Sequence, residues 1–372
     1  MTTPVTPRVG PDPKSYFDPL VFQREQREVF QRAWCFVAFS WELAKPNDFV
    51  TRTLGGVSVV VQNFGGELKA LHNVCAHRCS LIRTAPCGNG PLTCGFHGWT
   101  YDGRGVPVGI PGNAEFFGFT DEQKQARALR SFALETCGAF VFVRIAAEGP
   151  GLRAFLGPQW AVLQTLSKHF GAQPPLDDHR MPWATNWKVG VESVLEVYHV
   201  NPTHPDTFKK LVLPAWHFSP AGPLHSTAKS ILRDEMRGWW DRIIARLGLS
   251  RAEGMAEYDH FVLFPNVAIG VTHGALMSFQ TYEPVSPTEC VLHYRMVLAN
   301  SARMEPASTF VRKSVADTVT EFNRVLLEED RLAAENVQRG LRQASRPPVW
   351  GVNEGRIGLF HDALSQFEEV SG

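Results

Sequence analysis

The amino-acid sequence predicts an α+β fold in two domains: a small antiparallel β domain, then a larger domain with an antiparallel sheet and a long C-terminal helix. From Cys35 on, short apolar runs alternate with turn residues, which is typical of a small β domain. A second series of such runs lies between Phe261 and Leu298. The last long segment, Ala307 to Arg342, contains few helix breakers. A chain of 372 residues is long enough for two domains.

The first part of the chain predicts a helical segment followed by the small β domain. Residues 15–35 have a moderately amphipathic helical pattern. Glycine pairs at 55–56 and 65–66 indicate hairpin turns between strands. The strands expected here are 34–39, 49–54, 57–62, 68–71 and 140–143. We therefore divide the chain into an N-terminal helical segment (1–40) that packs on the larger domain, a small β domain (41–147) and the larger domain (148–372).

In the larger domain, a helix is expected to begin at about Trp187. This helix should reach Val200 and end there, because Pro202 and Pro205 cannot continue a helix interior. The remaining elements expected are a helix over 231–249, strands over 261–264, 267–271, 276–282 and 290–298, and a long helix over 307–342.

Two cysteine–histidine pairs stand close together in the small β domain. Cys75-Ala-His77 is followed after sixteen residues by Cys94-Gly-Phe-His97. Thiolate and imidazole are both metal ligands, so the four residues indicate a metal site. One Cys and one His in each loop favour a Rieske [2Fe–2S] centre, in which two His replace two Cys on one iron. The alternative is a structural zinc site, but zinc sites more often pair like with like.

Composition and charge exclude several other classes. Lys+Arg and Asp+Glu balance at 37 each, which gives no bulk case for nucleic acid or an anionic membrane. The N-terminus shows no secretory signal and no apolar run approaches the roughly 20 residues of a membrane span. The cysteines outside the metal motif are an odd, scattered set, so we expect a reducing, cytoplasmic compartment. A disulfide between Cys79 and Cys87 is the alternative that the spacing leaves open.

A second metal site is predicted where the helix from Trp187 ends. Glu196 and His199 share a helix face with Glu192, and Pro202 lets the chain turn His204 back toward His199. Two histidines and one carboxylate form the facial triad of non-haem Fe(II) oxygenases. The alternative for each residue taken alone is ordinary packing with satisfied hydrogen bonds.

The long C-terminal helix offers the missing carboxylate. An apolar stripe is expected on this helix, with Asp330 near its middle, and a carboxylate there is costly unless it is paired or binds a metal. Glu329, at the edge of the stripe, is the second choice, and a buried Arg partner for Asp330 is the alternative to metal binding. The stripe consists of Val319, Phe322, Leu326, Ala333 and Val337.

These motifs together resemble the α-subunits of Rieske non-haem iron oxygenases, the aromatic-ring-hydroxylating oxygenase family, over nearly the whole chain. Cys75, His77, Cys94 and His97 match the family's cluster motif, and Glu196, His199 and His204 match its motif for mononuclear iron. Asn186-Trp187-Lys188, Tyr198, Phe264-Pro265-Asn266 and the segment 329–340 around Asp330 are also similar.

The resemblance implies a Rieske domain, a helix-grip (START-like) catalytic domain that holds the iron, and a homotrimer. In such a trimer the cluster of one chain lies beside the iron of its neighbour, and Glu196 bridges the two centres. The family's bridging residue is usually Asp. Glu at this position resembles the members that oxidise quaternary ammonium compounds such as carnitine and glycine betaine, and also some aromatic oxygenases.

The activity implied is a mono- or dioxygenation with O₂ and electrons from NAD(P)H. The chain has no GxGxxG fingerprint and no plant-type ferredoxin cysteine pattern, so a separate flavin or ferredoxin reductase must supply the electrons. Apolar strands between residues 261 and 282 favour hydroxylation or oxidative dealkylation of a small aromatic or apolar substrate. The apolar residues expected around it are Phe261, Val262, Leu263, Phe264, Val267, Ile269, Val271, Leu276, Met277 and Phe279, with Thr272, His273 and Gln280 as polar groups.

Two alternatives remain open at this point. N-demethylation of a quaternary ammonium compound would need an aromatic cage for the cation. The candidates for such a cage are Trp187, Trp239, Trp240, Tyr258 and Tyr282. A non-catalytic electron carrier or ligand-binding protein is the other class, but the second metal motif argues against it.

Overall fold

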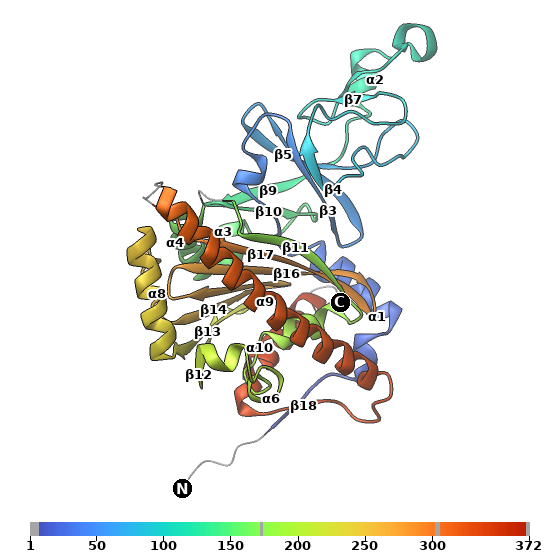
Figure 1. Cartoon of the computed structure of the whole chain (residues 1–372). Coiled ribbons are helices and arrows are strands. Elements are labelled where there is room, and N and C mark those ends of the chain that lie inside the picture. The colour runs from blue at the N-terminus through green and yellow to red at the C-terminus, as the bar shows by residue number, and fades with distance from the viewer. Residues whose placement is uncertain (1–6, 172–173, 302–305, 370–372) are drawn as a thin grey trace. The chain divides into compact units, whose positions relative to one another are not determined.

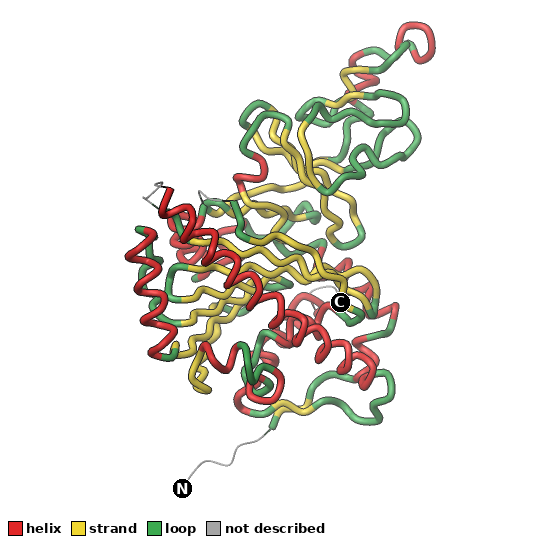
Figure 2. The backbone as a smooth tube through the Cα atoms, viewed as in Figure 1, coloured by secondary structure: helices red, strands yellow, loops and turns green. Residues whose placement is uncertain are grey.

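The computed structural model describes residues 7–171, 174–301 and 306–369, and it confirms the α+β prediction. The chain forms two compact units. The smaller unit runs from Glu25 to Phe155, and the larger unit takes the chain up to Arg24 and from Leu156 on. Helices, strands and loops are distinguished in Figure 2. The domain boundaries near residues 40 and 147 stay predictions.

The smaller unit is built on a seven-stranded antiparallel sheet in the order β2-β10-β9-β5-β4-β3-β6. Positive φ angles at Gly55 and Gly65 fit the hairpin turns expected at the glycine pairs. The five expected strands are present. The strands are β2 (Cys35–Phe39), β3 (Asp48–Leu54), β4 (Val57–Phe64), β5 (Glu67–His72), β6 (Cys87–Asn89), β9 (Ser131–Cys137) and β10 (Phe140–Arg144), and β7 (Thr100–Tyr101) pairs separately with β8 (Pro107–Gly109).

The structure differs from the sequence prediction in the strands of the smaller unit and in the first helical part of the chain. Strands β6, β7, β8 and β9 were not expected. In β9 only Phe132 and Cys137 are buried, so its apolar pattern is weak. The helix expected over 15–35 is broken. It consists of a 3₁₀ turn (Pro13–Tyr16), α1 (Pro19–Glu25) and a π-helical turn (Gln26–Phe30). The other short helices are α2 (Asp121–Gln125) and α3 (Leu152–Leu156).

The larger unit contains a second seven-stranded antiparallel sheet, in the order β11-β17-β16-β15-β14-β13-β12. Three of its strands were not expected from the sequence. Strand β12 includes Pro214 and Pro220, and proline is tolerated there because β12 is the edge of the sheet. The strands are β11 (Asp177–Trp183), β12 (Val212–Ala221), β13 (His225–Leu232), β14 (Tyr258–Leu263), β15 (Val267–Thr272), β16 (Leu276–Ser286) and β17 (Glu289–Leu298).

Helices cover this sheet, and the longest of them, α9 (Pro306–Leu341), runs across one face (Figure 1). The last helix, α10 (Gly355–Glu369), was not expected and packs against β12 and β13. The others are α4 (Gln159–Phe170), α5 (Trp187–Ser193), α6 (Val200–Thr203), α7 (Phe208–Leu211) and α8 (Asp234–Leu247). Among all the helices described, none is both long and apolar enough to cross a membrane.

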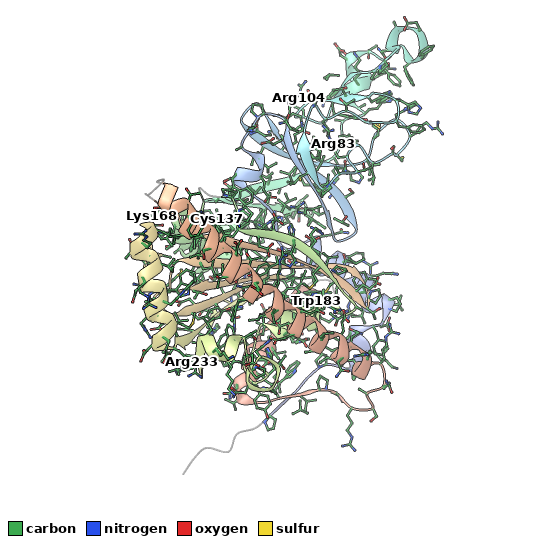
Figure 3. All side chains as sticks on the ribbon, viewed as in Figure 1. Arg83, Arg104, Cys137, Lys168, Trp183 and Arg233 are labelled. Atoms are coloured by element: carbon green, nitrogen blue, oxygen red, sulfur yellow. The ribbon has the colours of Figure 1, made fainter. Side chains whose placement is uncertain are left out.

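The core of the larger unit holds large aromatic side chains. Trp183, labelled in Figure 3 at the end of β11, is 1% exposed, and its ring meets that of Tyr282 edge-on at 5.7 Å. Tyr282 in turn packs against Gly190 of α5, where an added Cβ would lie 2.6 Å from the tyrosine ring. Glycine at this position therefore lets α5 approach the sheet closely.

The helix predicted over 187–200 is shorter than expected, because α5 ends at Ser193. The hydroxyl of Ser193 donates to the carbonyl of Gly190 within the last turn. The backbone N–H groups of Tyr198 and His199 then donate to the carboxylate of Glu196 rather than to a continuing helix. Consequently Glu196 and His199 lie on an irregular segment, not on a shared helix face.

Candidate metal centres and substrate cavity

Two histidines and one aspartate meet in the larger unit. His199 and His204 flank the short helix α6, and Asp330 lies on α9. Nε2 of His204 lies 2.9 Å from Oδ1 of Asp330, and Nε2 of His199 lies 3.5 Å from the same oxygen. One ligand atom from each residue lies within 4.8 Å of the other two. The fold therefore brings together the three residues that the sequence predicts.

Each histidine also has a carboxylate on its other ring nitrogen. Nδ1 of His199 donates to Glu196, and Nδ1 of His204 donates to Glu329 over 2.7 Å. Glu329 also accepts from the hydroxyl of Thr207 at 2.6 Å. A carboxylate on Nδ1 fixes the ring and leaves Nε2 for a metal. Glu329, the second choice for the third ligand, thus contacts His204 from the outer side.

The acid–base properties of this cluster follow from its hydrogen bonds. Burial opposes protonation of His199, but the hydrogen bonds to Asp330 and Glu196 outweigh it and raise its pKa to about 10. The pKa of His204 is also raised: burial again opposes the shift, and Asp330 and Glu329 outweigh it. Burial acts to raise the pKa of Asp330, but the two histidines lower it by more, so the pKa of this carboxyl lies below its usual value. The metal-free site therefore favours protonated imidazoles around a negative carboxylate, and a bound cation would replace those protons.

These three residues fit a mononuclear iron. Two imidazoles and one carboxylate on one side of a centre are the donor set of non-haem Fe(II) oxygenases, and they leave other positions open. Asp330 is only 5% exposed, so it is buried as predicted. The apolar stripe itself lies differently toward the C-terminal end of the helix, because Val337 is 49% exposed while Leu327 and Ala334 are buried.

Glu192 has a different place from the one its sequence spacing indicates. Its Oε1 accepts hydrogen bonds from the hydroxyl of Tyr16 at 2.8 Å and from Nε2 of His361 at 2.7 Å. Tyr16 lies near the N-terminus and His361 lies on α10. Glu192 thus ties three segments of the larger unit together.

The four residues of the cysteine–histidine motif lie on two loops of the smaller unit. Cys75 and Cys94 are 3% and 1% exposed, and the rings of His77 and His97 lie 4.5 Å apart toward the surface. Each cysteine begins a tight turn, in which its carbonyl accepts from the residue four positions on. Two inner thiols and two outer imidazoles match the two-sided ligand set of a Rieske cluster.

A buried atom without a partner supports this match. Nδ1 of His77 is buried and has no hydrogen-bond partner among the described residues. Its ring stacks on Trp99 at 5.0 Å, which fixes its orientation. The hydroxyl of Tyr101 lies 3.0 Å from Sγ of Cys75. Neither Cys79 nor Cys87 forms a disulfide.

A cavity of about 460 Å³ in the larger unit lies next to the His199, His204 and Asp330 cluster. A smaller cavity around the three metal-site residues shares four lining residues with it. The shared residues are Phe208, Tyr258, Gln280 and Leu326. Tyr258 lies against Gly270, where an added Cβ would be 2.7 Å from the tyrosine hydroxyl. The absence of a side chain at Gly270 therefore makes room for Tyr258 on the cavity wall.

The cavity is lined by a different set of residues from the one predicted. Of the apolar residues expected on strands 261–282, only Leu276 lines it, together with the polar Thr272 and Gln280. Side chains alternate between the two faces of a strand, so most of the apolar run points into the core on the other face. His273 also lies elsewhere, where it contacts Asp241. Helices α7, α8 and α9 supply most of the rest of the wall.

Three of the five residues considered for an aromatic cage line this cavity. Trp239, Trp240 and Tyr258 do so, and Phe208 and Phe322 add two more aromatic rings. Trp187 and Tyr282 are almost completely buried and do not line it.

Comparison with known proteins places both halves of the chain. Residues 33–132 match the Rieske [2Fe-2S] domain. Residues 172–368, more than half of the chain, match the catalytic domain of the ring-hydroxylating alpha subunit.

Curated relatives cover the chain to different extents. The alpha subunit of an N,N-dimethyl phenylurea N-demethylase from Sphingobium sp. is 33% identical over 192 residues, which are 50% of this chain and 42% of that protein. A glycine betaine monooxygenase oxygenase subunit from Chromohalobacter salexigens is 30% identical over 53% of this chain and 43% of that protein. The chain thus spans less than half the length of these two. A carnitine monooxygenase oxygenase subunit from Acinetobacter baumannii is 25% identical over 95% of this chain and 93% of that subunit.

Solved structures show the same fold. A quaternary ammonium Rieske monooxygenase in complex with L-carnitine superimposes with a TM-score of 0.78 at 21% identity, over 98% of this chain and 96% of that chain. Naphthalene 1,2-dioxygenase from Rhodococcus sp. bound to indole also gives 0.78, at 19% identity, over 96% of this chain and 94% of that chain. The resemblance seen in the sequence is confirmed, and the chain belongs to the family of ring-hydroxylating oxygenase alpha subunits, with a Rieske [2Fe–2S] domain before a catalytic domain of the kind that binds mononuclear iron.

Proposed function

We propose that this chain is the terminal oxygenase component of a Rieske non-haem iron oxygenase system. The observation that carries the proposal is the convergence of His199, His204 and Asp330 on one point beside a cavity of about 460 Å³. NAD(P)H is the reductant, and a separate flavin or ferredoxin reductase transfers its electrons to this chain. The second substrate is O₂.

The ligands are assigned by the donor atoms that the fold presents. His199 and His204 hold the iron through Nε2 and Asp330 through its carboxylate, while Cys75, His77, Cys94 and His97 hold the cluster. When bound, the cluster supplies electrons one at a time and the iron supplies the chemistry that activates O₂. Glu196 and Glu329 keep the two imidazoles oriented by accepting from Nδ1.

We assign Glu196 a second role as the bridge between centres. It already accepts a hydrogen bond from His199, and it lies two residues before Tyr198, which is 73% exposed. A cluster-ligating histidine of a neighbouring copy of the chain can donate to the same carboxylate. This role requires a homotrimer, which light scattering on the purified protein tests directly.

A small aromatic or apolar molecule is the substrate class that the cavity supports best. The wall is formed mainly by apolar and aromatic side chains from α7, α8, α9, β14 and β16. Such a wall excludes water from the reacting carbon and gains free energy from apolar contact. The reaction is hydroxylation or oxidative dealkylation at the end of the molecule that faces Asp330.

One observation favours oxidative N-demethylation of a quaternary ammonium compound as the second candidate. Trp239, Trp240 and Tyr258 line the same cavity, and aromatic faces attract such a cation. Glu at position 196 and the carnitine and glycine betaine monooxygenases among the relatives agree with it.

The experiment that tests the proposal combines metal analysis with turnover. The expected result is acid-labile sulfide, about three irons per chain and a Rieske-type EPR signal after reduction with dithionite. With a reductase and NADH, the protein should then couple O₂ uptake to product formation for at least one member of a panel of methylated aromatic compounds and betaines. Zinc without sulfide would overturn the assignment of the cluster, and iron-loaded protein that never couples O₂ uptake to a product would overturn the oxygenase. Product from betaines alone would select the second candidate.

A further inference from the structure

An arginine lies completely buried near the iron site without a carboxylate partner. Arg356, at the start of α10, is 0% exposed. Its Nε donates to the hydroxyl of Ser226 at 3.1 Å, and its guanidinium lies over the ring of Trp216 at 5.3 Å. Among the described residues it makes no ion pair. Burial lowers the pKa of Arg356 to about 9, so the group is still charged at neutral pH.

This arginine determines which ring nitrogen of a neighbouring histidine carries the hydrogen. Nη1 of Arg356 donates to Nδ1 of His260 at 3.2 Å. A guanidinium has no acceptor, so Nδ1 must be the unprotonated nitrogen of His260. Burial and the charge of Arg356 lower the pKa of His260 well below its usual value, which keeps the ring neutral. The remaining hydrogen therefore sits on Nε2.

The Nε2–H of His260 has no acceptor among the described residues, and the ring lines the cavity around His199, His204 and Asp330. Trp216 lines the same cavity, and its indole Nε1 is buried without a partner. The two rings lie 5.9 Å apart. Trp216 lies on β12 and His260 on β14. Trp216 pairs with Ser230, and Ser230 pairs with Tyr258, so Trp216 and Tyr258 share one face of the sheet. His260, two residues after Tyr258, lies on the same face. Two rings, each with an N–H that has no acceptor among the described residues, thus line the cavity of the proposed iron.

We propose that His260 and Trp216 bind a carboxylate group of the substrate, with Arg356 as the positioning residue behind them. A buried donor without an acceptor, such as the indole N–H of Trp216, is costly, and an incoming oxygen relieves that cost. A negatively charged oxygen does so better than a neutral one, because Arg356 lacks a counter-charge close by. This inference rests on the proposed function and adds to it: the substrate is an organic acid, with its apolar part in the large cavity.

The test is equilibrium binding to the iron-loaded enzyme without O₂ or reductase, measured by calorimetry. The probes are carboxylates paired with their amides: benzoate with benzamide, phenylacetate with phenylacetamide, and glycine betaine with its amide. We expect at least one carboxylate to bind about 10-fold or more tightly than its amide, since the amide lacks the charge. Whether that pair is aromatic or a betaine distinguishes the two sources of the carboxylate.

Variants then locate the preference. His260→Leu should weaken the preferred carboxylate about 10-fold or more and leave its amide nearly unchanged. Arg356→Gln retains a donor toward Nδ1 of His260 but removes the charge, and should also reduce the preference. Trp216→Phe keeps a ring in place, removes one donor, and should have a smaller effect. The matched control is His217→Leu: this exposed histidine follows Trp216 on β12, so its side chain is directed to the other face.

Two results would overturn the inference: no carboxylate preferred over its amide in any pair, or a preference that survives in both His260→Leu and Trp216→Phe. Circular dichroism and the Rieske EPR signal confirm that each variant is folded. Because binding is measured without turnover, failure here is distinct from failure of the oxygenase proposal, which appears as uncoupled or absent O₂ uptake.

Discussion

The two metal-binding regions of this chain are built in opposite ways. The four cluster residues lie between Cys75 and His97, on two loops of one small sheet. The iron residues are separated by more than a hundred positions, because His204 and Asp330 meet only when α9 packs against α6. The first site is local and its geometry is set by tight turns. The second depends on the packing of a whole unit.

Their surroundings differ in the same sense. His77 and His97 have no carboxylate partner among the described residues, and aromatic rings hold them in place. His199 and His204 each have one carboxylate on Nδ1. The cluster histidines are therefore oriented by packing within their own loops, whereas the iron site depends on acidic residues that orient the neutral imidazoles of His199 and His204 toward a divalent cation. Variants of those acidic residues can break or sharpen the contrast.

Asp330→Ala should have the largest effect. Among the residues that the structure describes, it removes the only carboxylate that reaches both histidines through Nε2, so the mononuclear iron should be lost and product formation abolished. The cluster lies in the other unit and should be unaffected. Iron content with EPR of the reduced cluster measures both. Retained oxygenase activity would refute Asp330 as a ligand.

Glu196→Gln should leave both metals bound but slow product formation by roughly 100-fold, because a neutral amide is a weaker acceptor for the two imidazoles it would connect. Single-turnover measurements with pre-reduced enzyme separate electron transfer from the reductase step. Normal single turnover would exclude Glu196 as the bridge.

Glu329→Gln tests the carboxylate behind His204. Removing its charge should weaken iron binding by about 10- to 100-fold, as is typical when the outer partner of a metal-binding histidine is changed. The matched control is Glu328→Gln on the same helix, since Glu328 pairs with Arg331 on the exposed side. Competition with a chelator measures the affinity, and equal affinities in the two variants would contradict the assigned role.

The smallest effect is expected from pH. The pKa of His199 is raised to about 10 and the pKa of His204 is also raised, so both rings bind protons more strongly in the metal-free protein than a free imidazole does. Iron must displace these protons, so its affinity should increase with pH, by up to about tenfold per pH unit for each proton released. The increase should stop above the folded pKa values. Proton release on anaerobic iron binding, followed with an indicator dye, should be absent for the cluster-only variant Asp330→Ala.

The local cluster motif was easier to predict from the sequence than the iron site, whose residues are far apart in the chain. The C-x-H and C-x-x-H spacing predicts the four cluster ligands, because those residues are close in sequence. Asp330 was found by its position on an apolar helix face, although that face was placed wrongly at Val337. The break of α5 at Ser193 was missed, because a side-chain carboxylate replaces the backbone acceptors there.

The residues around the cavity were the hardest to predict. His260 and Trp216 become neighbours only through the pairing of β12, β13 and β14, and β12 and β13 were not recognised as strands. Arg356 lies on a helix that no sequence signal indicated. The one available signal was the alternation of Tyr258 and His260 within an apolar run, which places both side chains on one face.

During synthesis, the larger unit can be completed only after the C-terminal part of the chain has been made. Its first strand, β1 (Arg8–Val9), pairs with β18 (Val349–Trp350), and Arg8 forms an ion pair with Asp362 of α10. The smaller unit, by contrast, has all its strands once β10 has left the ribosome. Domains generally fold as units during synthesis, so the cluster loops can form while the start of the chain still waits for its end. A chain truncated before α10 should therefore retain a folded cluster domain beside an incomplete iron site.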